Sequence, residues 1–173
     1  MAISDVNVNP MSVIWDGADL GSTSGGVSIS ISVDSVDIVA DQSGSAPVDS
    51  YQTGQALEIS MTLIELNQDN LSYMLGAGIG GKNSANNRSG LGSSRDFTSM
   101  LSRAKTLQLR EVGATDNSSD WIFFKAFPVL DSFDLTPDSA QSMSVTFRCF
   151  KDTTKDAAIS YGVLKADPDD TWT

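Results

Sequence analysis

Two stretches in the first half of the chain alternate strictly between apolar and small polar residues. Residues 25–33, GGVSISISV, place an apolar side chain at every second position, and residues 57–65, LEISMTLIE, repeat the pattern. A period of two describes a β-strand with one buried face and one polar face. We therefore expect two half-buried strands whose outer faces carry hydroxyl groups and a carboxylate. These outer positions are Ser28, Ser30, Ser32, Glu58, Ser60 and Thr62.

The connection between the two strands is unusually long. Residues 34–54 contain turn-forming sequences at 41–44, DQSG, and at Ala46-Pro47, and residues 36–40 predict a further short strand. A connection of about 21 residues without structure of its own is uncommon in a compact domain. Its mixture of Val, Ile, Pro and Tyr51 predicts a projecting loop that becomes ordered on a partner.

The rest of the chain predicts more strands and one or two short helices. Asn67 can cap a helix that ends near Leu75, residues 76–95 are rich in Gly, Ser and Asn and predict a mobile loop, and residues 97–104 fit a second short helix. Further strands are expected at 106–112, 121–127, 143–149 and 159–163. The stretch 121–127 is aromatic on both faces and should be covered on both. The predicted fold is α+β but mostly β, an antiparallel sandwich or partial barrel.

Size and composition indicate one globular domain that spans residues 1–173. The hydrophobic share is 40% and the charged share 19%, and no apolar run is long enough to cross a membrane. The first ten residues lack the features of a signal peptide, so we expect the protein to remain in the cytoplasm where it is made. A single cysteine, Cys149, agrees with a reducing compartment.

The net charge of −11 is unevenly distributed. Residues 1–81 contain ten acidic residues and no Lys or Arg, and the first basic residue is Lys82. An anionic half of this size argues against a surface that grips nucleic acid by its phosphates. The acidity either serves solubility alone or builds a surface that does not hold a polyanion.

Residues that carry catalysis are scarce in this sequence. It contains no histidine, which removes the commonest general base and most zinc sites. Cys149 alternates with apolar neighbours and is expected to be an inert core thiol. Residues 76–81 match G-x-G-x-x-G, but the required strand before and helix after the glycines are not predicted. We expect no catalytic, cofactor-binding or metal-binding residues, and no enzyme activity.

The central stretch contains a series of short motifs: Gly25-Gly26-Val27 at a strand start, Asp41-Gln42-Ser43-Gly44, Pro47-Val48-Asp49, Gly54, and Leu63-Ile64-Glu65 with Leu71 after it. In their order and spacing these motifs resemble the tail tube (major tail) proteins of long-tailed bacteriophages. The resemblance covers about residues 21–75, under a third of the chain.

The resemblance implies a structural virion protein, assembled in the host cytoplasm and located in the viral tail. Such proteins form hexameric rings that stack into a tube for genome ejection, with strands of neighbouring subunits joined in a ring-wide β-barrel. It implies that Ser28, Ser30, Ser32, Glu58, Ser60 and Thr62 face an acidic lumen. It also implies that Asp41, Gln42, Gly44, Pro47, Val48 and Asp49 lie in an inter-subunit loop.

The partners implied are other copies of the chain, the tape measure, tail terminator and baseplate or distal tail proteins, and a sheath if the tail is contractile. Double-stranded DNA would pass without specific binding, and no membrane is involved. A different interpretation is a fimbrial or cell-surface β-sandwich that binds a ligand through the Gly/Asn-rich loop and requires export.

Overall fold

The computed structural model describes residues 10–39, 41–66, 70–71, 74, 80–83, 88–91, 98–114, 119–137 and 140–164. This part of the chain is mostly β, with very short helical segments, as predicted. The main sheet contains β1 (Met11–Trp15), β2 (Ala18–Asp19), β3 (Thr23–Val39), β4 (Pro47–Leu63), β7 (Lys105–Glu111), β8 (Trp121–Asp134), β9 (Ser142–Cys149) and β10 (Gly162–Leu164). The remaining elements are β5 (Gly80–Asn83), β6 (Arg88–Leu91), α2 (Met100–Arg103) and the 3₁₀ turns η1 (Asp41–Ser43) and η2 (Ala157–Ile159).

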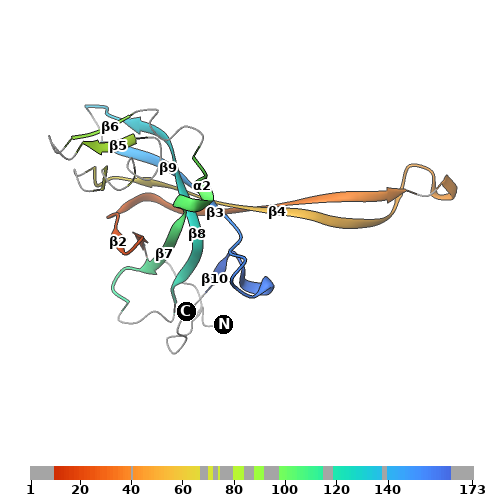
Figure 1. Cartoon of the computed structure of the whole chain (residues 1–173). Coiled ribbons are helices and arrows are strands. Elements are labelled where there is room, and N and C mark those ends of the chain that lie inside the picture. Colours follow the sequence, from red (N-terminus) through yellow and green to blue (C-terminus); the bar gives the residue numbers. More distant parts are fainter. Residues whose placement is uncertain are drawn as a thin grey trace, which may run out of the picture.

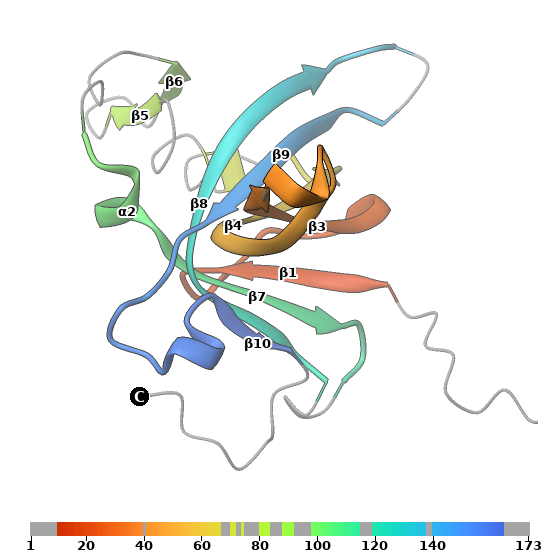
Figure 2. The ribbon, with the colours of Figure 1, turned by 90° about the vertical axis from the view of Figure 1, so that its right-hand side faces the viewer.

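The main sheet is antiparallel and strongly curled. Its strand order is β2-β1-β7-β8-β9-β4-β3, and β10 pairs with β8. Figure 2 shows β1 and β7 facing β4 and β9 across the body. Trp15 of β1 lies 6.4 Å from the ring of Phe147 of β9, and its indole N–H donates to the carbonyl of Ala126. The body is therefore a partial barrel made from one open sheet rather than two separate packed sheets.

The curled sheet encloses one main core. Completely buried side chains come from β1, β4, β7, β8 and β9. The largest of them include Val13, Ile59, Leu63, Leu107, Leu109, Phe123, Met143, Val145 and Phe147. Strand β8 is covered on both faces, as expected, because consecutive residues are buried at 122–124 and again at 126–128. The Arg103 guanidinium lies 4.9 Å from the Phe127 ring, and the Lys155 ammonium lies 5.3 Å from the Phe124 ring. Cys149 is buried, and burial raises the pKa of its thiol to about 12.

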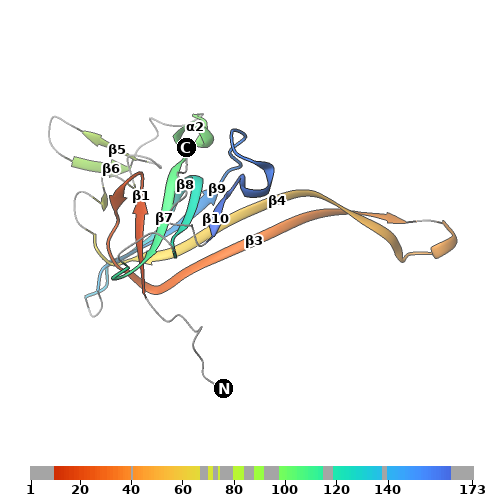
Figure 3. The ribbon, with the colours of Figure 1, turned by 90° about the horizontal axis from the view of Figure 1, so that it is seen from below.

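The hairpin of β3 and β4 extends far beyond the body (Figures 1 and 3). Each strand has 17 residues, and their pairing continues out to Val39 opposite Pro47. The prediction of a long loop over residues 34–54 is therefore wrong, because most of this segment is paired strand. Residues 36–39 belong to β3 itself and do not form a separate short strand.

Paired glycines bend β3 near its start, inside the body. Gly25 and Gly26 both have positive φ, 77° and 84°, and the register with β4 skips them between Ser24 and Val27. Glycine populates this backbone region without the steric cost that a Cβ brings. The Gly-Gly pair thus explains how the edge strand follows the curl of the sheet.

The end of β4 is fastened to the segment that enters β3. The Glu65 carboxylate accepts hydrogen bonds from the Ser22 amide at 3.0 Å and the Ser22 hydroxyl at 2.7 Å. The Asn70 side-chain amide donates to the carbonyls of Leu20 and Glu65, at 2.8 and 3.1 Å. The Glu65 of the Leu63-Ile64-Glu65 sequence therefore has a structural role at the foot of the hairpin.

Several local predictions need correction or fall outside the described residues. The predicted loop 76–95 contains the antiparallel pair β5 and β6, so Gly80 and Gly81 begin a strand and not a helix. The predicted last strand is shorter, since Ile159 lies in η2. Asn70, Leu71 and Met74 are helical, whereas Asn67, Leu75 and Phe97 lie outside the described residues.

Candidate interaction surfaces

The predicted polar positions of β3 and β4 share one face of the sheet. Ser28 lies opposite Ser60 and Ser30 opposite Glu58, so their side chains point to the same side. Strand β9 extends this surface, because Thr62, Ser60 and Glu58 pair with Ser144, Thr146 and Arg148. We call this surface the hydroxyl face; its members are Ser28, Ser30, Ser32, Glu58, Ser60, Thr62, Ser144, Thr146 and Arg148.

Hydrogen bonds link the side chains of the hydroxyl face across the strands. The hydroxyls of Ser60 and Thr146 lie 3.1 Å apart, and those of Thr62 and Ser144 lie 3.5 Å apart. Thr146 also donates to the Asp131 carboxylate of β8 at 2.6 Å. The face is thus a connected polar surface that remains in contact with solvent.

The hydroxyl face carries more charged groups than the single carboxylate, Glu58, that the sequence predicted. Glu58 Oε1 lies 3.3 Å from Arg148 Nε, with both side chains about half exposed. Asp131 adds a second carboxylate beside Thr146, and we include it in the hydroxyl face from here on. Among Glu58, Arg148 and Asp131 the net charge is −1, and Asp131 supplies it because Glu58 and Arg148 offset each other. Sequence reasoning missed Arg148 and Asp131 because their places depend on how β9 pairs with β4 and β8.

The outer part of the hairpin, which we call the arm, comprises residues 31–39 and 47–56. Strand β9 pairs with β4 only from Leu57 inward, so the two arm strands pair with each other alone within the described structure. The arm nevertheless exposes large apolar side chains by 47–61%. They are Ile31, Val33, Val36, Ile38, Val39, Val48 and Tyr51.

The residues expected in an inter-subunit loop lie at the arm's end. Asp41 and Gln42 belong to η1, and Gly44 adopts φ of 65° in the turn that follows. The other three, Pro47, Val48 and Asp49, belong to β4 rather than to a loop. All six are exposed.

The apolar residues change ribbon face halfway along the arm. On β3 they occupy odd positions through Val33 and even positions at Val36 and Ile38, and a register shift separates Asp34 from Ser35. Beyond the shift, Val36 lies opposite Tyr51. The other face there is polar, and Asp37 accepts a hydrogen bond from the Ser50 hydroxyl. We call Val36, Ile38 and Tyr51 the distal patch.

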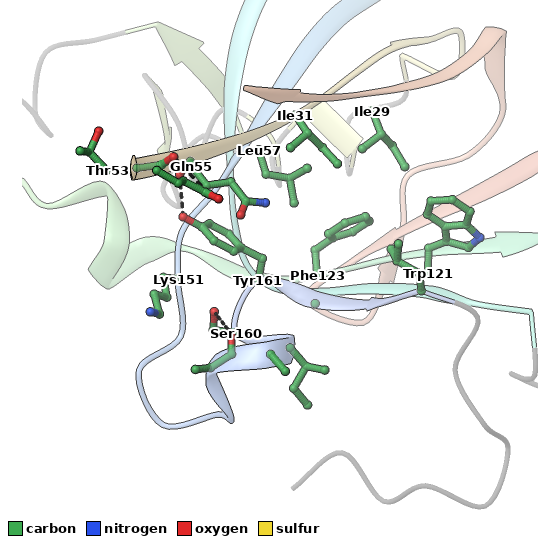
Figure 4. Close-up of a pocket in the computed structure, with 17 residues that line it drawn as sticks. Ile29, Ile31, Thr53, Gln55, Leu57, Trp121, Phe123, Lys151, Ser160 and Tyr161 are labelled. Carbon is green, nitrogen blue, oxygen red and sulfur yellow. Dashed lines mark hydrogen bonds between the residues drawn. The ribbon is translucent and has the colours of Figure 1, made fainter. Parts of the chain in front are cut away.

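An open groove of about 660 Å³ lies at the base of the arm (Figure 4). Ile29, Ile31 and Leu57 point into it from the hairpin. Trp121, Phe123 and Tyr161 form the opposite wall, and the Tyr161 hydroxyl donates to the Gln55 carbonyl at 2.7 Å. Residues 157–160, Leu164 and Lys151 complete the rim.

A metal-binding cluster or a membrane-spanning helix would indicate another kind of function. No group of three or more metal-binding side chains is found in the described part of the chain. None of the helices described there is long and apolar enough to cross a bilayer. The carboxylate of Asp120 is fully buried, and Arg110 Nη2 lies 2.7 Å from it, which ties the start of β8 to β7.

No protein-family model matches the chain, and a search of curated proteins finds no match. The surfaces that the fold presents therefore carry the functional argument.

Proposed function

We propose that this chain is the subunit of a phage tail tube, in which hexameric rings stack into a hollow conduit for the genome. The observation that carries the proposal is the β3–β4 hairpin. It begins in the wall of a curled sheet and continues as a ribbon with exposed apolar side chains. An isolated two-stranded ribbon is marginally stable in water, and apolar exposure of this kind marks interaction surfaces. Repeated copies would cover the arm.

The open edge of the sheet also supports the proposed assembly. Strand β3 is the last strand of the sheet, and the structure describes no partner for its outer edge. Open edges invite pairing with other chains, and closure into a barrel removes them. A ring-wide β-barrel of joined copies would satisfy this edge and leave no pairing site for foreign strands.

The hydroxyl face suits the wall of a bore through which DNA passes. Its side chains are small, and its charged groups, Glu58, Arg148 and Asp131, sum to −1 per copy. A carboxylate at ~10 Å from a phosphate costs about 0.4 kcal/mol in water, less after screening. Such repulsion is too weak to stop duplex DNA, with its charge about every 1.7 Å, yet it discourages sticking over many rings.

In this proposal the other partners are those of a virion tail. They are the tape measure, tail terminator and baseplate or distal tail proteins, with a sheath if the tail contracts. The protein would assemble in the host cytoplasm and reside in the virion.

Negative-stain electron microscopy of the purified protein tests the proposal. The wild-type chain should form rings or tubes. In a shortened variant, an Asn-Gly turn replaces residues 34–54 and connects Val33 to its partner Gln55. This variant should remain a folded monomer. A wild-type chain that stays monomeric at high concentration, or tubes of normal length from the shortened variant, would contradict the proposal.

A charge series at Glu58 tests the lumen separately. Glu58→Lys changes the charge of the hydroxyl face from −1 to +1, and Glu58→Gln, the matched control, changes it to 0. Virions with Glu58→Lys should carry normal tails but eject DNA more slowly, with Glu58→Gln close to wild type. Equal ejection rates in all three would rule out the electrostatic account of the bore.

A further inference from the structure

The groove at the base of the arm is a partly apolar surface that no described segment of the chain covers. Ile31, Ile159 and Leu164 all line the groove and are exposed by 59, 38 and 55%. Trp121 and Tyr161 are only partly buried. An apolar concavity of this kind is a typical acceptor for an apolar ribbon or side-chain cluster.

The distal patch is an apolar surface of matching character on the same chain. Val36, Ile38 and Tyr51 are exposed by 56, 47 and 60%. The opposite ribbon face at this level is polar, with Ser35, Asp37 and Ser50 on it. Between residues 35 and 38 the arm is thus amphipathic, whereas Val39, nearer the tip, is an exposed apolar residue on the other face.

The arm cannot place the distal patch in the groove of its own chain. Gln52, opposite Ser35, is the outermost hairpin residue that lines the groove, and the distal patch begins at the next pair outward, Val36 and Tyr51. The chain reverses only beyond the patch, through η1 and the turn that follows it at residues 41–46. Figures 1 and 3 both show the arm leading away from the body. A second copy can supply the patch.

The charges of the two surfaces are complementary. The arm and its tip contain Asp34, Asp37, Asp41 and Asp49 and no basic residue. Lys151 is the only charged residue among the described residues that line the groove, and no carboxylate of the described chain forms an ion pair with it. The neighbouring Asp152 remains ionised, because hydrogen bonds from the Thr154 amide and hydroxyl lower the pKa of its carboxyl group, so the complementarity rests on Lys151 as a single positive group.

From these observations we infer that the groove of each copy receives the distal patch of another copy's arm. The contact joins two different surfaces of the same chain, so it is heterologous and propagates around a ring or along a stack. This inference rests on the proposed function for the form of the assembly, and the contact itself requires only a second copy.

Cysteine cross-linking between copies tests the contact. Val36→Cys protein is mixed with Ile159→Cys protein and treated with a short bismaleimide; the matched control is Ser35→Cys, the adjacent position on the other ribbon face, with Ile159→Cys. Native Cys149 stays silent because it is buried and its thiol pKa is about 12. The Val36 pair should give at least tenfold more cross-linked dimer than the Ser35 pair. Equal yields, or none, overturn the inference.

Filling the groove gives an independent measurement. Ala158→Arg places a long side chain in the groove, whereas Thr153→Arg adds the same charge on an exposed residue outside its lining. Ala158→Arg should lower the assembled fraction at least tenfold, with circular dichroism of the monomer unchanged, and Thr153→Arg should leave assembly intact. Equal assembly of the two variants would count against the contact.

Electron microscopy of the same samples separates this inference from the proposed function. Rings or tubes without the Val36–Ile159 cross-link overturn the inference and leave the proposed function standing. A strong cross-link without rings or tubes retains the contact and rejects the tail tube. The absence of both rejects both.

Discussion

The inner and outer halves of the β3–β4 hairpin are formed by the same two strands but differ in how their apolar side chains are buried. In the inner half, Leu57, Ile59, Met61 and Leu63 are buried against the curled sheet, and β9 pairs with β4. In the outer half, no third strand of the described chain pairs with the ribbon, and its apolar residues are exposed. Identical backbone pairing therefore does not make the two halves equally stable on their own. The inner half is held by its own chain, and the outer half needs an assembly.

Thiol reactivity should show the largest difference between the two regions. Cys149 of β9 packs beside the inner half, and its thiol pKa of about 12 leaves roughly a thousandfold less thiolate than an ordinary cysteine with pKa about 8.5. A Val36→Cys thiol on the arm should therefore react with a chromogenic disulfide at least a thousandfold faster than Cys149. Comparable rates in the native monomer would contradict the burial of β9.

Truncation of one isoleucine in each half sharpens the comparison. Ile59 is fully buried, and Ile59→Ala should lower the free energy of unfolding by about 2–5 kcal/mol. Ile38 is 47% exposed, and Ile38→Ala should change it by less than about 0.5 kcal/mol. Urea denaturation of the monomer measures both. A large loss from Ile38→Ala would mean that the arm packs on its own chain.

The inner half was predictable from sequence, and the outer half was not. The alternation in residues 27–33 and 57–63 keeps one phase, and burial of one face follows it directly. In the arm, the apolar phase changes between Val33 and Val36, and on β4 Thr53 has no partner in the register. This interruption hid the continuous strands and made the segment resemble a loop.

The hydroxyl face was predictable only in part, for a different reason. Its β3 and β4 members follow from local alternation. Arg148 meets Glu58 only because β9 pairs with β4, across about 90 residues of sequence. Register between distant strands is set by the whole sheet and by its turns, and a single sequence does not reveal it.

Alanine substitutions at two glycines with positive φ, Gly21 and Gly44, compare the foot of the hairpin with its tip. At Gly21, φ is 84° and an added Cβ would lie 2.6 Å from Glu65 Cδ, so Gly21→Ala should destabilise the fold by roughly 1–3 kcal/mol. At Gly44, φ is 65° and no atom lies within 4 Å of an added Cβ. The backbone strain that Gly44→Ala introduces is therefore confined to the turn and does not disturb the packing of the body. Thermal unfolding should show a lower midpoint for Gly21→Ala alone. Equal shifts would indicate that tip and foot unfold as one unit.

The smallest expected effect is a pH dependence confined to the foot of the hairpin. The hydrogen bonds from the Ser22 hydroxyl and amide lower the pKa of Glu65 below its ordinary 4.5. A carboxyl whose pKa is lower in the folded state stabilises the fold above its unfolded pKa, and this contribution disappears as pH falls through the folded value. Glu65→Gln keeps an acceptor for Ser22 but cannot titrate. Wild type should therefore be slightly more stable than Glu65→Gln at pH 7, and the difference should vanish as the pH is lowered from 4.5 through the folded pKa of Glu65. A constant difference across this range, measured by urea unfolding, would show that the charge of Glu65 contributes nothing to holding the foot of the hairpin.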